Sequence, residues 1–172
     1  FCWGQNLYGE LGIGNTTNMT TPQPVLGGNN FSSISAGNQI TCAINTTGSA
    51  FCWGNNTYGQ LGLGNFSTTV NLPTPQLVAG GYNFTSISAG YQSVCALNTT
   101  ENAYCWGRNN NNQLGLGSSN TTSMYTPQNI SWVNNFTTIS LFYIGKRRNT
   151  LKNINKVYLN RSMILFQMQN TR

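Results

Sequence analysis

The chain has 172 residues, of which 38% are hydrophobic and 6% are charged. It contains no histidine, and its only carboxylate side chains are Glu10 and Glu101. The sequence lacks paired acids and a Cys–His dyad, which catalysis commonly uses. It also lacks a CxxC- or histidine-based metal site, and its Gly-rich segments lack the lysine of a phosphate-binding loop. We therefore expect no catalytic residue, no metal site and no cofactor, and a protein that is not an enzyme.

The formal net charge of +6 belongs to the end of the chain. Residues 1–140 hold Glu10, Glu101 and Arg108, for a net charge of −1, whereas residues 141–172 hold seven Lys and Arg residues and no acid. Binding to a nucleic-acid backbone requires several basic side chains on one surface. We therefore expect residues 1–140 not to bind nucleic acid.

One pattern occurs three times along the chain. Phe-Cys-Trp-Gly at residues 1–4 returns at residues 51–54 and, with Tyr in place of Phe, at residues 104–107, so that the copies start 50 and 53 residues apart. Periods of this length are typical of solenoids and propellers. The sequence predicts repeats over residues 1–50 and 51–103 and a partial repeat over residues 104–140.

Each repeat contains short apolar, β-branched and aromatic runs bounded by Gly, Asn, Pro and Ser, which is typical of strands. The first repeat predicts a weak strand over residues 23–26, a strand over residues 31–36, and a hairpin formed by residues 40–44 and 50–53. Four short strands per period suit a propeller blade, which must stack on neighbours to bury both faces. The predicted fold class is all-β: a partial β-propeller of about three four-stranded blades, the third incomplete, with a divergent basic tail.

Two bulky residues recur in every repeat and are predicted to form the blade core. They are the tryptophan of the tetrapeptide and the isoleucine twelve residues after the proline: Trp3, Trp53, Trp106, Ile34, Ile87 and Ile139. A glycine cluster also recurs, and Asn112 replaces its second glycine in the third repeat. Because asparagine tolerates the left-handed region better than other non-glycine residues, we expect a positive φ at Asn112.

These motifs resemble the repeat of the regulator of chromosome condensation family. The resemblance covers residues 1–140 and rests on FCWGxNxYGQLGxG, then TPQ, then FxxISAG, then TCAxNTTGxAFCWG. It implies a seven-bladed β-propeller with one repeat per blade, so that this chain would hold fewer than three repeats and the remaining blades would lie outside it. Since the sequence starts inside a motif and without Met, we expect an internal piece of a longer protein.

Two pairs of cysteines, Cys42 with Cys52 and Cys95 with Cys105, are each separated by ten residues. If Ile44 faces Ala50 across the hairpin, Cys42 faces Cys52 directly, at a distance that a disulfide can bridge. The sequence therefore favours disulfides Cys42–Cys52 and Cys95–Cys105. The alternative is that all five cysteines are buried free thiols, because cysteine packs well as a small apolar residue.

The chain also contains twelve Asn-X-Ser/Thr sequons. Asn45 and Asn98 lie at predicted hairpin tips and are the candidates for glycosylation. Disulfides and sequons together indicate an extracellular or secretory-lumen protein. Enrichment of Asn and Thr by nucleotide bias is the alternative explanation, and it leaves a nuclear or cytoplasmic location open.

Residues 141–172 depart from the repeat. They form either a basic amphipathic helix, with Leu151, Ile154, Tyr158, Leu165 and Met168 loosely on one face, or a read-through or disordered segment. We favour the second interpretation, because the tail lacks the order of the repeats. No transmembrane segment is predicted anywhere in the chain.

The resemblance implies three kinds of activity: nucleotide exchange on a Ran-type small GTPase with chromatin binding, protein interaction within larger proteins, and enzyme inhibition by a secreted propeller. Ile40 and Ser93 stand where the family often has histidine, which weakens transfer of the first role. We interpret the chain as a protein-interaction propeller that binds a protein through loops at one end, over residues 15–21, 65–74 and 118–126. Nucleotide exchange and glycan binding are the alternatives.

Overall fold

The computed structural model describes residues 1–64, 71–117, 120–130, 136–143 and 155–160. Within these ranges the chain forms strands and turns but no helix, so the predicted all-β class is confirmed. No helix in the described part is long and apolar enough to span a bilayer.

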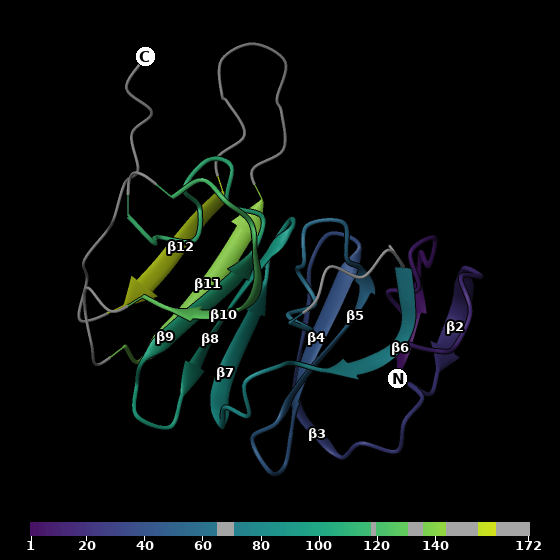
Figure 1. The fold of residues 1–172 in the computed structure, drawn as a ribbon. Helices are drawn as coiled ribbons and strands as arrows, with labels where there is room; N and C mark the ends of the chain where they lie inside the picture. Colours follow the sequence, from purple (N-terminus) through teal and green to yellow (C-terminus); the bar gives the residue numbers. More distant parts are fainter. Residues whose placement is uncertain (65–70, 118–119, 131–135, 144–154, 161–172) are drawn as a thin grey trace.

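Two four-stranded antiparallel sheets make up most of the molecule, and they lie side by side in Figure 1. The first sheet, blade one, contains β3 (Phe31–Ala36), β4 (Ile40–Asn45), β5 (Ala50–Asn55) and β6 (Asn71–Leu77) in that order. The second, blade two, contains β7 (Phe84–Ala89), β8 (Ser93–Asn98), β9 (Ala103–Gly107) and β10 (Met124–Asn129). An N-terminal pair, β1 (Cys2–Gly4) with β2 (Met19–Gln23), and a C-terminal pair, β11 (Thr138–Tyr143) with β12 (Asn155–Asn160), flank the blades.

The blades are out of phase with the sequence repeats. Blade one takes β3 and β4 from the first predicted repeat and β5 and β6 from the second, and blade two is composed in the same way. The predicted repeat boundaries at residues 50 and 103 therefore fall inside the sheets. Each boundary lies within a hairpin, because the tetrapeptide that starts a repeat belongs to the third strand of a blade.

The fourth strand of each sheet is an edge strand that carries prolines. The strand predicted over residues 23–26 is displaced: the chain is extended at β2, where Gln23 pairs with Cys2. Proline lacks the N–H that a strand donates to its neighbour, so it is tolerated at an edge. Pro22, Pro75 and Pro127 all lie in such strands, β2, β6 and β10, which explains why the Thr-Pro-Gln motif recurs there.

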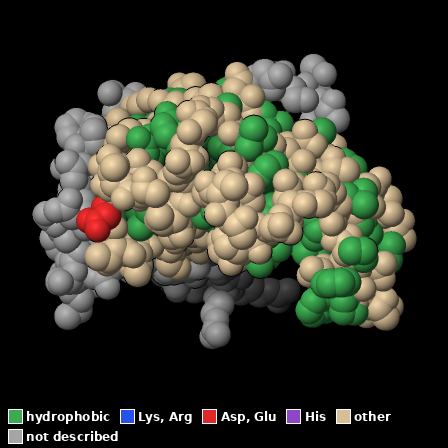
Figure 2. All heavy atoms as spheres, turned by 90° about the horizontal axis from the view of Figure 1, so that it is seen from below, with side chains coloured by type: hydrophobic (Ala, Val, Ile, Leu, Met, Phe, Trp, Pro, Cys, Tyr) green, Lys and Arg blue, Asp and Glu red, His purple; other side chains and the backbone are tan. Residues whose placement is uncertain are grey.

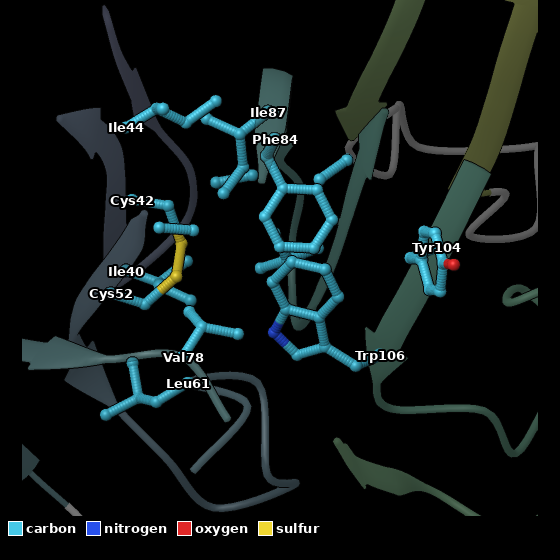
Figure 3. Close-up of a cluster of buried hydrophobic side chains, with 14 residues drawn as sticks. Ile40, Cys42, Ile44, Cys52, Leu61, Val78, Phe84, Ile87, Tyr104 and Trp106 are labelled. Atoms are coloured by element: carbon cyan, nitrogen blue, oxygen red, sulfur yellow. A yellow bond between two sulfur atoms is a disulfide. The ribbon is translucent and has the colours of Figure 1, made fainter. Parts of the chain in front are cut away.

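The main core lies between the two blades (Figure 3). Phe84, Ile87 and Trp106 of blade two pack against Ile44 and the Cys42–Cys52 disulfide of blade one. A second cluster joins blade two to the C-terminal pair and contains Ile139. The flat sheets thus bury their faces by stacking, as the repeat pattern predicts.

Four of the six predicted core residues are buried: Trp53, Trp106, Ile87 and Ile139. The other two expectations are wrong for this chain, since Trp3 is 60% exposed and Ile34 is 53% exposed. Ile87 is buried because the complete blade one lies against it. The sheet that precedes blade one has only two described strands, and Trp3 belongs to it, so neither Ile34 nor Trp3 has a four-stranded sheet to pack against as Ile87 has.

Two described segments at the end of the chain are strands. β11 continues to Tyr143, beyond the predicted end of the repeat at residue 140. Residues 155–160 form strand β12, paired with β11 from Thr138 opposite Asn160 to Tyr143 opposite Asn155, so the helical interpretation is wrong there. Residues 144–154 and 161–172 lie outside the described residues, and the read-through interpretation stays a prediction.

Candidate interaction surface

The blades have two different ends. At the turn end, short turns 37–39 and 90–92 and the long loops that follow β1, β5 and β9 come together. At the hairpin end, turns 46–49 and 99–102 connect β4 to β5 and β8 to β9, and they point downward in Figure 1. The described parts of the three stretches predicted to bind a partner belong to the turn end.

Those predicted binding stretches are only partly loops. Residues 15–18 and 120–123 are loop, whereas residues 19–21, 71–74 and 124–126 belong to strands β2, β6 and β10. Residues 65–70 and 118–119 lie outside the described part of the chain. The described loop part of the predicted stretches is therefore shorter than expected. The short turns 37–39 and 90–92 lie beside these loops and are added to the candidate surface.

A buried asparagine organises each long loop. The side-chain Oδ1 atoms of Asn6, Asn56 and Asn109 accept hydrogen bonds from the main-chain N–H five residues further on, at 2.9, 3.0 and 3.0 Å. All three asparagines are buried. They are not among the predicted site residues, although each recurs two residues after the tetrapeptide glycine.

Recurrent hydrogen bonds also join one sheet to the next. Trp53 Nε1 donates to the Glu10 main-chain oxygen and Trp106 Nε1 to the Gln60 main-chain oxygen, both at 2.9 Å. In each case the tryptophan of one sheet reaches the long loop of the preceding sheet. The turn end is therefore built on a fixed frame in which each loop is attached to the next blade.

Two backbone features of the loops follow from the sequence. Asn112 has a φ of 55°, which confirms the expected left-handed turn. Gly59 has a φ of 75°, and a Cβ there would lie 2.1 Å from Cδ1 of Tyr125 in blade two. Only glycine allows the loop of blade one to approach the neighbouring blade so closely.

Arg108 is a feature of the turn end that the sequence analysis did not single out. It follows β9 directly and is the only Lys or Arg before Lys146. Its Nη1 donates to Gln92 Oε1 at 2.6 Å and its Nε to Asn110 Oδ1 at 2.5 Å. Its guanidinium carbon lies 4.9 Å from the ring centre of Tyr58, in the loop of blade one. This arginine therefore bridges the two blades at the surface.

The hairpin end has a different chemistry. Asn45 Oδ1 accepts from Thr47 N at 3.1 Å, Thr47 Oγ1 at 2.8 Å and Ser49 N at 2.9 Å, and Asn98 makes the equivalent bonds. Their Nδ2 atoms, which an N-glycan would occupy, have no hydrogen bond among the described residues. Figure 2 views this end, where red acidic atoms are visible and no blue of Lys or Arg appears on the described residues.

The cysteine pairs lie directly opposite each other, as the sequence predicts. Disulfides join Cys42 to Cys52 and Cys95 to Cys105, with Cα atoms 4.1 Å apart in both, and all four residues are fully buried. Cys2 is a half-buried free thiol. Burial raises the pKa of the Cys2 thiol above its ordinary value, and the nearby N-terminal ammonium opposes this shift.

The family model for the regulator of chromosome condensation (RCC1) repeat matches residues 1–44, 47–97 and 102–142. The chain belongs to this family. A second RCC1 repeat model matches residues 31–60 and 84–113, which span the β3–β5 and β7–β9 segments. The resemblance predicted from the motifs over residues 1–140 is confirmed.

Solved structures with RCC1-type propellers share the fold. Yeast RCC1 (Prp20) bound to Kap60 superimposes with a TM-score of 0.70 at 20% identity, over 80% of this chain and 35% of that one. Prp20p from Saccharomyces cerevisiae gives a TM-score of 0.70 at 19% identity, over 80% and 36% of the two chains. Human WBSCR16 gives 0.66 at 23% identity, over 81% and 36%. This chain spans about a third of each.

The RCC1 repeats of this chain carry few ionisable groups. Among the described residues there is no group of three or more His, Cys, Asp and Glu side chains that could hold a metal ion. Glu10 Oε2 accepts a hydrogen bond from Tyr8 N at 2.7 Å, so this carboxylate closes its own loop. In the next two repeats Gln60 and Gln113 make the same bond, both at 2.8 Å.

Proposed function

We propose that the chain is part of a non-catalytic propeller that binds another protein through the turn end of its blades. One observation carries the proposal: the contacts that build the blades recur from repeat to repeat, whereas other residues of the turn end differ. Asn56 and Asn109 make the same hydrogen bonds, while Asn55 of blade one corresponds to Arg108 of blade two. A constant frame with variable loops is the usual arrangement of a binding surface.

We further propose an extracellular or secretory-lumen location. Its support is the pair of buried disulfides, since such bonds persist in oxidising compartments and are rare in the cytosol and nucleus. The sequons at Asn45 and Asn98, whose threonines are exposed, agree with that location.

The alternative is a nuclear propeller that acts on a Ran-type GTPase or on chromatin. Its support is the fold likeness to Prp20p, a protein described by its binding to Gsp1p and histones. Non-reducing peptide mapping of the protein from its native host separates the two. Linked Cys42–Cys52 and Cys95–Cys105 peptides support the oxidising compartment, and five alkylated thiols support the nuclear alternative. Glycan binding stays a third hypothesis, which a glycan array tests.

The partner surface is tested by site-specific photo-crosslinking with four matched positions. Thr16 and Thr121 at the turn end and Thr46 and Thr99 at the hairpin end are all exposed, and each is the central residue of an Asn-Thr-Thr sequon. A photoreactive amino acid at each position leaves the sequon intact. We expect discrete crosslinked products in the native host's extracellular fraction from the turn-end positions only. Products from the hairpin-end positions alone would contradict the proposal.

A further inference from the structure

Arg108 occupies a place where blade one has an asparagine with a structural task. Asn55 Oδ1 accepts from Gln60 Nε2 at 3.1 Å and from Thr57 N at 2.8 Å, and Asn55 Nδ2 donates to Gln39 Oε1 at 3.2 Å. Asn55 thus satisfies a buried glutamine and ties the long loop to the short turn.

In blade two, Arg108 performs only half of this task. It keeps the bond to the short turn, through Gln92 Oε1. A guanidinium has donors but no acceptor, so it offers nothing to Gln113, the counterpart of Gln60. Gln113 is 5% exposed, and its Nε2 is buried without a hydrogen-bond partner among the described residues. Since buried polar groups are normally paired, the arginine is unfavourable for its own loop.

The guanidinium is nevertheless held in a fixed position. The Tyr58 ring lies under it, and Gln92 and Asn110 accept from Nη1 and Nε. These two bonds use two of the five N–H donors of an arginine, which leaves three for a ligand. The remaining donors include both of those on Nη2, so a planar, two-oxygen ligand can be met by a side chain that is already ordered.

No carboxylate of the described residues occupies those donors. Glu10 accepts from Tyr8 N in the loop of the N-terminal pair, and Glu101 lies in the β8–β9 turn at the hairpin end. The charge of Arg108 is therefore neither required by the blade nor neutralised within it.

We propose that Arg108, stacked on Tyr58, is the anchor of the turn-end surface and binds a carboxylate side chain of the protein partner. This inference rests on the proposed protein-binding function. A protein carboxylate is favoured over a nucleic-acid phosphate because Arg108 is the only basic residue before Lys146, and backbone binding requires several. Arginine and tyrosine held in place are also the residue types that dominate protein interfaces.

The test is selection of peptide ligands by the complete, disulfide-bonded chain from a random dodecapeptide phage library. The selected peptides should be enriched in Asp and Glu relative to the library. Replacing the critical acid of a selected peptide by Asn or Gln should weaken its binding at least tenfold. Arg108→Asn should weaken binding of the original peptide by a similar factor. In a charge-reversal test, the critical acid of the peptide is replaced by Lys. The Arg108→Glu variant should bind this Lys peptide more tightly than the wild-type chain does.

Glu101→Gln provides the matched control, since it changes one charge at the hairpin end, and it should bind within twofold of wild type. Thermal unfolding of each variant checks that lost binding is not lost folding. Selected peptides without acidic enrichment, or equal binding by Arg108→Asn, would overturn the anchor while leaving the turn end as a binding surface. Failure to select any peptide would overturn the proposed function and the anchor with it.

Discussion

The indole N–H of Trp106 in blade two donates to the main-chain oxygen of Gln60 in blade one, and the two atoms lie 2.9 Å apart. Trp53 makes the same bond to Glu10 in the N-terminal pair. Trp53 and Trp106 are thus buried in the core and also fix the loops of the turn end that they contact. Stability and the shape of the candidate surface are therefore coupled through these residues.

Trp106→Phe should lower the free energy of unfolding by roughly 1–3 kcal/mol, because it leaves the buried Gln60 oxygen without a partner. Urea unfolding measures the change. Trp53→Phe is the matched control and should have the smaller effect, since its bond is only partly buried. Equal stability of Trp106→Phe and wild type would show that this hydrogen bond contributes nothing to the stacking of the blades.

Arg108→Asn should raise the free energy of unfolding by about 1 kcal/mol, because an asparagine at this place supplies the acceptor that Gln113 lacks. The reverse change in blade one, Asn55→Arg, should lower it by about the same amount by leaving Gln60 Nε2 unpaired. Thermal or urea unfolding of both variants provides the comparison. A less stable Arg108→Asn variant would mean that the arginine supports the blade.

Features that depend on one hairpin or one turn were predicted, whereas features that depend on how many strands a neighbouring sheet has were not. The opposed cysteines and the positive φ of Asn112 depend on one hairpin or one turn, so spacing and residue type were sufficient. Exposure of Ile34 depends on how many strands face it, which the repeat does not encode. Arg108 of the third repeat stacks on Tyr58 of the second repeat. No sequence motif links these two positions, so only the structure shows that they are in contact.

Glu101→Gly should stabilise the chain by about 1 kcal/mol. Glu101 has a φ of 61°, a conformation that disfavours residues with a Cβ, and its counterpart in blade one is Gly48, with a φ of 85°. Gly48→Ala is the matched reverse change and should destabilise by about 1 kcal/mol. Differential scanning calorimetry of the two variants tests the pair, and opposite shifts in Tm are required.

Replacing Cys42 and Cys52 together by alanine should lower the free energy of unfolding by about 2–3 kcal/mol, since the disulfide closes a short loop in the unfolded chain. Cys2→Ala should change it little, because Cys2 forms no disulfide. Both disulfides are fully buried, so a reductant should cleave them only under unfolding conditions. Thiol labelling with and without urea measures this, and rapid reduction of the folded chain would contradict the buried arrangement.

Glycopeptide mapping of the protein secreted from a eukaryotic host should find glycans on Asn45 and Asn98 but not on Asn55. Asn45 and Asn98 lie at hairpin tips with Nδ2 unbonded among the described residues, whereas Asn55 is 5% exposed and donates from Nδ2 to Gln39. All three are Asn-X-Thr sequons, so the expected difference comes mainly from their structural surroundings. A glycan on Asn55 would require the loop of blade one to open before modification.

The offset between the sequence repeat and the four-stranded blade determines where such a chain can be cut or extended by duplication. Cutting or duplicating it at residue 50 or 103 would separate Cys42 from Cys52, or Cys95 from Cys105, and leave half a sheet on each side. The segment between β6 and β7, residues 78–83, is the place where whole sheets can be parted. The sequence repeat is therefore a different unit from the folded blade. A disulfide links the second repeat to the first and the third repeat to the second.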